Sequence, residues 1–578
     1  MSDFLIIPTE YLEAVFDQLE CPSVIPMRIS DRWSAVLQAP PRAVSRPVSG
    51  VYAAQGRWVF AASTDATAKQ VSNSVGWSNG RFTLNEHEVG VYGAAVVRSD
   101  WEDLICWASR PNTRPVFWSH TSAGSVVSSR AKECAIAASV LTGRAIRKNP
   151  DYARSVLLWG YALDGVSPFQ GVEVLKPGAV LRISANGVPP ALTSPLRANL
   201  ELGLFGEQEG ASELARVLIS SVNRIPKNSS VVLRLSGGKD SRTLLAALVA
   251  AGRSVVAETR GRPSDDEVKV AWRLSQLAGI DFRISPVPKA SEGNVEERVL
   301  ATLNRLAGFI PSEAHQSVFG GAGMINPGGV LLMGQSHIQR GGFARTMANS
   351  LEKSRRVLLG QMASRFVHPD VQLHGLNYLD SWLAANMTDN FLELLYEFHV
   401  QHRAGAYLAP HMLDYSAEAE LVYPMIDSSF VRVCDRLPMV AKVSERAVQR
   451  AISIMAPELL TIPLASAGWR AKFLGTGVSE EQEPVTDLVI PIEDVAADRS
   501  EDYSPLQDAA VHDVVKSLVD GGLWEGLRSN LSPQFEEELQ LVSQEGLAPL
   551  RRSCSAVALL DWKKYVWRLY NVALWQGM

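Results

Sequence analysis

The sequence predicts an α/β protein of two domains, a layered β-rich domain over residues 1–190 and a parallel-sheet domain over residues 205–578. Three observations support this fold class. With 578 residues, the chain is too long for a single hydrophobic core. Its first part alternates short apolar segments with turns, whereas its later part alternates short apolar runs with helical periods. A Pro/Ser-rich stretch at residues 186–203 marks the boundary, and residues 191–204 are predicted to be a linker.

The predicted strands of the first domain are short alternating segments with turn residues between them. They cover residues 50–63, 88–99, 103–110, 115–120 and 124–129. Alternation with a period of two places one face of each strand toward a core. This pattern is typical of a layered β-rich domain.

The second domain alternates two kinds of segment. Apolar runs at residues 230–235, 254–259 and 328–334 suit buried parallel strands. Helical periods run over residues 211–225, 241–252, 266–279 and 445–460. Such alternation predicts a parallel sheet covered by helices.

Composition excludes several classes of protein. The chain is 46% hydrophobic and 20% charged, as in ordinary globular proteins, and carries a formal net charge of −5. It has no run of about 20 apolar residues and no basic signal segment, so we expect a cytoplasmic protein with no membrane association. A negative net charge does not favour nucleic acid as a partner. The five cysteines form no CxxC pair and are expected to be buried small hydrophobes: Cys21, Cys106, Cys134, Cys434 and Cys554.

The most informative stretch is Ser-Gly-Gly-Lys-Asp-Ser at residues 236–241, between a predicted strand and a predicted helix. Such a turn aims backbone N–H groups and the positive end of a helix dipole at one point, which is a site for phosphate. Gly237 and Gly238 let the backbone approach a ligand closely. The GxxxxGK[ST] spacing of a Walker A loop is absent.

The side chains of this stretch also suit a phosphate ligand. Ser236, Ser241 and Lys239 can donate hydrogen bonds to phosphate oxygens, and Asp240 can hold a magnesium ion that bridges them. The SGGxDS pattern resembles the pyrophosphate loop of the ATP pyrophosphatases, which cleave ATP between the α and β phosphates to adenylylate a substrate.

Over nearly its whole length, the chain resembles the asparagine synthetase family. The resemblance follows the same order along the chain in five further segments, at residues 108–137, 171–183, 254–279, 417–438 and 468–477. It implies a degenerate N-terminal-nucleophile, glutaminase-like α+β sandwich domain followed by an ATP-pyrophosphatase-type, adenine nucleotide α-hydrolase-like domain.

The resemblance also implies the site residues and cofactors, ATP and Mg²⁺. Lys239 and Lys472 would be catalytic, with Lys472 neutralising oxyanion charge during acyl transfer. Asp240 would hold the magnesium ion. The residues implied to contact the nucleotide are Leu235, Ser236, Gly237, Gly238, Lys239, Asp240, Ser241, Val256, Gly334 and Arg340.

One departure from the family concerns glutamine. Glutamine-using members begin Met-Cys, and that cysteine is the nucleophile, whereas this chain begins Met1-Ser2 and its first cysteine is Cys21. A serine hydroxyl is far less nucleophilic than a thiolate. We therefore expect that glutaminase chemistry is lost and that the amine comes from the substrate or another molecule.

A second departure concerns the metal. The family's SGEGSDELFGGY supplies a second acidic magnesium ligand, but the matching stretch here, residues 333–343, reads MGQSHIQRGGF. Counting back from the paired glycines places His337 and Ile338 near the expected carboxylates. Arg340 could replace the metal as a phosphate clamp. Alternatively, the site is weakened and Arg340 only caps a turn.

The function implied is ATP-dependent amide-bond formation through an acyl-adenylate, with lasso peptide cyclisation as the leading case. A precursor peptide would be the substrate, and a leader-peptide-binding protein and a protease would be partners. The alternatives are a β-lactam-synthetase-like ligase, for which Tyr407 and Glu420 are available as a base pair, a divergent asparagine synthetase, an RNA-modifying enzyme and a non-catalytic scaffold.

Overall fold

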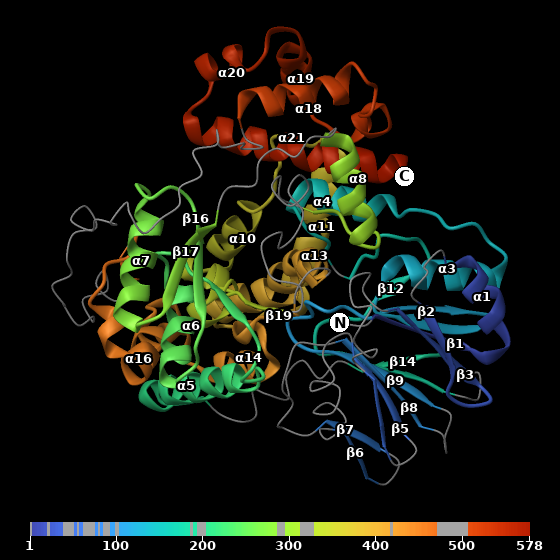
Figure 1. Ribbon diagram of the computed structural model, residues 1–578. Helices are drawn as coiled ribbons and strands as arrows, with labels where there is room; N and C mark the ends of the chain where they lie inside the picture. Colours follow the sequence, from blue (N-terminus) through green and yellow to red (C-terminus); the bar gives the residue numbers. More distant parts are fainter. Residues whose placement is uncertain are drawn as a thin grey trace.

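The computed structural model describes residues 3–19, 24–38, 51–54, 57–61, 75–78, 81–84, 93–98, 103–163, 165–184, 189–193, 204–285, 295–311, 329–416, 420–466, 468–470 and 507–578. Within these ranges, two six-stranded antiparallel sheets precede one five-stranded parallel sheet along the chain (Figure 1). The chain is therefore a mixed α/β protein, as the sequence predicts.

The antiparallel sheets contain all the strands predicted for the first part of the chain. The first sheet has the order β12 (Glu173–Val174), β10 (Phe117–Thr121), β11 (Gly124–Ser128), β1 (Asp3–Pro8), β3 (Trp33–Gln38) and β2 (Val24–Arg28). The second has the order β14 (Ala191–Thr193), β13 (Val180–Ile183), β9 (Leu104–Ala108), β8 (Gly93–Arg98), β5 (Arg57–Ala61) and β4 (Val51–Ala54). A separate hairpin joins β6 (Val75–Ser78) to β7 (Arg81–Leu84). Because β14 pairs with β13, the second sheet extends into the predicted linker.

The two antiparallel sheets share a core. Ile6 of β1 is buried together with Cys106 of β9 and Leu181 of β13, so strands of both sheets contribute to it. Leu5, the neighbour of Ile6 in β1, instead joins the larger core that contains Cys134 of a covering helix. Because successive side chains of a strand point to opposite faces, one face of β1 packs against the second sheet and the other face packs against the covering helices. The covering helices are α1 (Leu12–Gln18) and α3 (Ala131–Thr142).

The prediction of buried cysteines is confirmed for three of the four described cysteines and is wrong for Cys554. Cys106, Cys134 and Cys434 are buried and Cys554 is partly exposed, all as free thiols. Burial raises the pKa of the Cys106 and Cys134 thiols, which suits inert core residues. Cys21 lies outside the described residues.

The parallel sheet has the order β17 (Asp281–Ser285), β16 (Val256–Arg260), β15 (Val231–Arg234), β18 (Val330–Leu332) and β19 (Glu420–Val422). The three predicted apolar runs form β15, β16 and β18, and these strands are mostly buried. The chain moves from β15 outward to β17, then returns to the other side of β15 as β18. This reversal is a topological switch point.

Helices surround the parallel sheet (Figure 1). The four predicted helical periods form α5 (Glu207–Asn223), α6 (Lys239–Ala250), α7 (Asp266–Ala278) and α16 (Arg446–Met455), and α5, α6 and α16 pack together. The others between residues 295 and 460 are α8 (Val295–Arg305), η3 (Ile338–Arg340), η4 (Gly342–Thr346), α10 (Leu351–Leu359), α11 (Pro369–Ala385), α12 (Phe391–Phe398), the π-helical turn η5 (His399–Ala404), α13 (Gly405–Ser416), η6 (Pro424–Ile426), α14 (Ser428–Arg436), α15 (Met439–Val443) and η7 (Pro457–Leu460).

A group of C-terminal helices completes the structure at the top of Figure 1. It comprises α18 (Asp508–Val519), η10 (Glu525–Asn530), α19 (Pro533–Glu545), α20 (Ala548–Ser553) and α21 (Ala556–Gly577). The last helix contacts α8 and also α4 (Pro150–Trp159) in the earlier part of the chain. Among the described helices, none has the length and apolar character needed to cross a bilayer.

Candidate functional site

A cavity lies at the switch point of the parallel sheet. In open α/β sheets, ligands bind outside the carboxyl ends of the strands at the point where the strand order reverses. Here, the residues that follow β15 and β18 line one cavity of about 660 Å³. The predicted site residues that line it are Leu235, Ser236, Gly238, Lys239, Asp240, Ser241, Gly334 and Arg340.

The loop between β15 and α6 is held by its own side chains. The Ser236 backbone N–H donates to Ser241 Oγ at 3.0 Å, and the Gly238 N–H donates to Ser236 Oγ at 3.1 Å. The Gly237 N–H donates to the Glu267 carboxylate at 2.6 Å. Gly238 is the N-cap of α6 and provides no side-chain cap, so the positive end of the helix dipole lies at the cavity.

Two of the predicted contacts need separate comment. An added Cβ at Gly334 would lie 3.1 Å from the Asp240 carbonyl carbon, so this glycine allows the loop after β18 to lie against α6. Val256 begins β16, whereas the described cavity lining on this strand consists of residues 258–260 at its other end. The structure therefore does not bring Val256 to the cavity, because the ligand side of a parallel strand is its carboxyl end.

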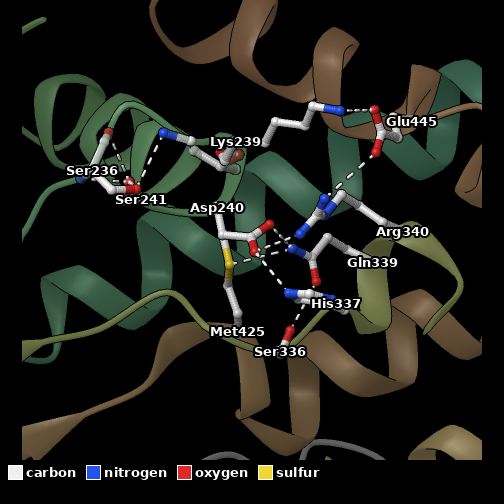
Figure 2. Close-up of polar contacts among 12 residues, drawn as sticks. Ser236, Lys239, Asp240, Ser241, Ser336, His337, Gln339, Arg340, Met425 and Glu445 are labelled. Carbon is white, nitrogen blue, oxygen red and sulfur yellow. Dashed lines mark hydrogen bonds and ion pairs between the residues drawn. The ribbon is translucent and has the colours of Figure 1, made fainter. Parts of the chain in front are cut away.

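Both carboxylate oxygens of Asp240 are already bonded (Figure 2). Gln339 Nε2 donates to Asp240 Oδ1 at 2.7 Å, and Arg340 Nη2 donates to Asp240 Oδ2 at 2.8 Å. Burial raises the pKa of Asp240, against the opposing effect of Arg340. His337 Nε2 lies 3.9 Å from Asp240 Oδ2, and the His337 side chain is 52% exposed. Partial desolvation and the nearby arginines Arg340 and Arg345 lower the pKa of His337, which disfavours the protonated imidazole.

These residues do not fit a protein-bound magnesium ion. Mg²⁺ requires free oxygen ligands in near-octahedral geometry, and the Asp240 oxygens are occupied by an amide and a guanidinium. The position that matches the second carboxylate of the asparagine synthetase family holds His337, whose pKa is lowered, and the next residue, Ile338, is buried in the core. No group of three His, Cys, Asp or Glu side chains within the described ranges could hold a metal.

Lys239 is paired inside the site. Its Nζ lies 2.5 Å from Glu445 Oε2 and donates to the Gly468 carbonyl oxygen at 3.1 Å. The Trp469 ring lies below it, with 5.4 Å between Nζ and the ring centroid. Burial lowers the pKa of Lys239, and the ion pair with Glu445 opposes that shift.

Glu445 is the centre of a cationic cluster. Its side chain is fully buried, and its other oxygen, Oε1, lies 3.5 Å from Arg340 Nη1 and 3.6 Å from Arg345 Nη2. The Glu445 backbone has a φ of 65°, a left-handed conformation that costs about 1–3 kcal/mol in a non-glycine residue. Sequence reasoning missed Glu445 and Arg345, because both resemble ordinary charged residues in polar stretches.

A second ion-pair cluster crosses three neighbouring strands of the parallel sheet. Glu258 of β16 is fully buried between Arg234 of β15 and Arg283 of β17, which are its partners in the strand register. Arg283 Nε donates to Glu258 Oε2 at 2.6 Å, and Arg234 is bonded to the other oxygen. These ion pairs hold the Arg234 and Glu258 side chains in place where they line the cavity.

Other predicted residues lie outside this constellation. Ser2 and Lys472 are not among the described residues, and the Glu420 side chain is not described. Tyr407 is covered by the Arg403 guanidinium, whose carbon lies 3.3 Å from the ring centroid. Tyr407 is not among the described residues that line the cavity.

Comparisons with known proteins give little further information. No protein-family model matches the sequence, and no curated protein matches it. Several solved structures, including the following two, are similar over part of the chain. One, described as the allosteric regulatory enzyme of purine biosynthesis, has 10% identity, covers 51% of this chain and 82% of its own, and has a TM-score of 0.21. The other, the glutamine phosphoribosylpyrophosphate amidotransferase from B. subtilis complexed with ADP and GMP, has 12% identity, covers 62% of this chain and 78% of its own, and has a TM-score of 0.19. At such TM-scores, neither likeness bears on the fold or chemistry of this chain.

Proposed function

We propose that the protein is an ATP-dependent ligase that activates a carboxylate as an acyl-adenylate and joins it to an amine. The observation that carries this proposal is the Ser-Gly-Gly-Lys-Asp-Ser loop, which opens α6 at the switch point and lines the cavity. A helix N-terminus with adjacent Lys and Arg side chains suits a triphosphate.

The reaction balances in two steps. A substrate carboxylate attacks the α phosphorus of ATP and releases pyrophosphate, and an amine then attacks the acyl carbon and releases AMP and a proton. Lys239 and Arg340 would stabilise the departing pyrophosphate, since both line the cavity beside the loop. Holding the two reacting groups in one site makes the second step effectively unimolecular.

The substrate we propose is a precursor peptide whose N-terminal amine and side-chain carboxylate are joined in a macrolactam. This choice extends the resemblance to members of the asparagine synthetase family that lack glutaminase chemistry and join an amine and a carboxyl of one molecule. A leader-peptide-binding protein and a protease would supply the free N-terminus.

The direct test measures pyrophosphate release from ATP without glutamine, with and without a candidate leaderless peptide. The wild type is compared with Asp240→Asn, which keeps the side-chain volume, and with Arg355→Met, which removes an exposed arginine of α10. We expect peptide-dependent release in the wild type and Arg355→Met, loss in Asp240→Asn, and a product lighter by one water. Release that does not depend on Asp240 would contradict the proposal.

A non-catalytic nucleotide-binding scaffold is the second candidate. Two contacts favour it: Asp240 is fully bonded to Gln339 and Arg340, and the Gly237 N–H is occupied by Glu267. ATP binding without pyrophosphate release, for every peptide and small carboxylate tested, would favour this function over the ligase.

A further inference from the structure

The cluster around Glu445 has more positively charged than negatively charged side chains. It contains Lys239, Arg340 and Arg345, which all line the cavity, and two carboxylates, Asp240 and Glu445. Cations therefore outnumber carboxylates. Over the whole described lining, the cationic side chains Arg234, Lys239, Arg260, Arg340 and Arg345 outnumber the acidic Asp240, Glu258 and Glu267.

Several polar atoms of this cluster lack hydrogen-bond partners. Within the described part of the chain, the buried Nε atoms of Arg340 and Arg345 make no hydrogen bond, and Glu445 Oε1 makes only the two long ion-pair contacts. The Arg340 side chain is 9% exposed. Buried unpaired donors are rare in folded proteins and require an explanation. An anionic ligand in the cavity would supply the missing acceptors.

The mutual arrangement of the cations also indicates such a ligand. Arg340 and Arg345 each lower the pKa of Lys239, after the larger effect of burial, and Arg340 lowers the pKa of Arg345 in the same way. Like charges held this close repel one another, and an anion between them relieves the repulsion. The guanidinium fork matches phosphate oxygens in a bidentate manner.

We propose that Lys239, Arg340 and Arg345 bind a polyphosphate directly, so that the site holds the triphosphate of a nucleotide without a protein-bound divalent cation. The inference rests on the proposed ATP binding, and it assigns to the guanidinium groups the charge neutralisation that a magnesium ion provides elsewhere. Glu445 is a positioning residue that gathers the three cations. Asp240 orients Arg340, and Figure 2 shows this contact beside the ion pair of Lys239 with Glu445.

The test uses calorimetric titration of the purified full-length chain with ATP and with inorganic tripolyphosphate, in magnesium buffer and in excess EDTA. We expect dissociation constants for the wild type that agree within about threefold between the two buffers. The Arg345 side chain is partly exposed, and its one ion pair to a described residue is the 3.6 Å contact with Glu445. Arg345→Ala is expected to weaken both ligands about tenfold or more in EDTA. Arg340→Lys tests the fork geometry, and Arg355→Met is the matched control with wild-type affinity.

The outcomes separate this inference from the proposed function. Binding of both ligands that requires magnesium would overturn the inference and leave the ligase proposal standing. Metal-independent binding without pyrophosphate release, for any carboxylate, would support the inference and overturn the ligase proposal. An unchanged affinity in both Arg345→Ala and Arg340→Lys, with wild-type melting temperatures, would also overturn the inference.

Discussion

Gly237 and Gly238 are adjacent in the loop but have very different surroundings. A Cβ added to Gly237 would lie 2.3 Å from the Ala465 Cβ and 3.3 Å from the Glu267 Cα, so no flexible side-chain end could move aside. A Cβ added to Gly238 would meet only Ser236 Oγ, at 3.1 Å. We expect Gly237→Ala to destabilise the protein by about 1–3 kcal/mol through overpacking, and Gly238→Ala to cost much less. Thermal and urea unfolding of the two variants measures the difference, and equal losses would contradict this explanation.

Lys442 gives a prediction about pH. This lysine of α15 is buried, donates to the Cys434 carbonyl oxygen at 2.9 Å and lies 3.7 Å from the centroid of the Tyr396 ring. Burial lowers the pKa of Lys442 to about 8, although Asp435, Cys434 and Glu393 oppose the shift. Between about pH 8 and the ordinary lysine pKa, the unfolded chain binds more protons than the folded chain. The contribution of Lys442 to the free energy of unfolding therefore increases as the pH rises over this range, and this contribution is lost as the pH falls through about 8.

The matching experiment compares melting temperatures of the wild type and Lys442→Met between about pH 7 and 9, below the range in which buried thiols and phenols titrate. The wild type is expected to gain stability relative to the variant as the pH rises. A difference that stays constant over this range would show that Lys442 does not titrate there.

Glu445 illustrates the part of the site that sequence reasoning could not reach. It stands in the polar stretch Lys442-Val443-Ser444-Glu445-Arg446, where a charged residue before a helix is usually solvated. Its partner Lys239 is 206 residues away, and the pairing depends on how α16 and α6 pack. In contrast, the residues of the loop itself are consecutive in the sequence. Their position between a predicted strand and a predicted helix is enough to predict that they lie around one site. Local chemistry was therefore predictable, whereas tertiary ion pairs were not.

At the scale of elements, α6 is fixed by a buried arginine. Arg242 is fully buried, and its Nη atoms donate to the carbonyl oxygens of Leu459, Ile462 and Pro463, at 3.2, 2.6 and 2.6 Å. This segment leads directly to Ala465, whose N–H donates to the Gly237 carbonyl oxygen at 3.2 Å. Arg242 thus connects the helix that opens at the loop to the chain that covers it.

We expect Arg242→Ala to destabilise the protein by about 2–4 kcal/mol, because the carbonyl oxygens would lose their donors in a buried setting. We also expect it to weaken ATP binding, because the segment that contacts the loop would shift. Differential scanning calorimetry and ATP titration measure the two effects. The control is Arg253→Ala, which removes a single exposed hydrogen bond to Pro226 just after α6. Wild-type ATP affinity in a destabilised Arg242→Ala would show that the segment acts on stability alone.

Some elements were predictable from local patterns, but many others, such as β1, β19 and α21, and the order of the strands in space were not. The apolar runs that became β15, β16 and β18 are buried on both faces, and such strands are nearly continuous apolar segments. β17 was missed because its sequence, Asp-Phe-Arg-Ile-Ser, is mostly half-exposed at the sheet edge. The reversal between β15 and β18, which creates the cavity, depends on crossover connections that no short pattern in the sequence encodes.

At the scale of the whole molecule, the last helix connects distant parts of the chain. Arg568 of α21 donates to the Leu157 carbonyl oxygen at 3.2 Å, and Asn571 donates to the Pro311 carbonyl oxygen at 3.0 Å. Lys148 in turn donates to the Trp575 carbonyl oxygen at 2.6 Å. The aromatic side chains of α21 are buried: Trp562, Tyr565, Trp567, Tyr570 and Trp575. Two of them, Trp562 and Tyr565, pack against Phe535 of α19. Through α21, Lys148 and Leu157 in the first part of the chain are thus joined to Pro311 in the second, independently of the linker that precedes α5.

Arg110 provides the sharpest test of how the two sheet regions are coupled. It follows β9 of the antiparallel region and donates to Glu397 of α12 through Nη1 at 3.1 Å and Nη2 at 2.8 Å. The same Nη2 lies 3.4 Å from Asp435 Oδ1 of α14, and the Arg110 side chain is 15% exposed. Removing one partner of a largely buried ion pair leaves an uncompensated charge, which costs about 3–5 kcal/mol.

We therefore expect Arg110→Met to lower the melting temperature and to separate calorimetric unfolding into two transitions, because the lost contacts all cross between the two regions. Adding Glu397→Gln to Arg110→Met should restore part of the loss, since it removes one of the two unpaired carboxylates. The matched control is Arg355→Met, which breaks an exposed bidentate pair with Asp380 within the helical region and should cost less than about 1 kcal/mol. If Arg110→Met unfolds in a single transition at the wild-type temperature, the apolar contacts of α21, and not this ion pair, hold the two regions together.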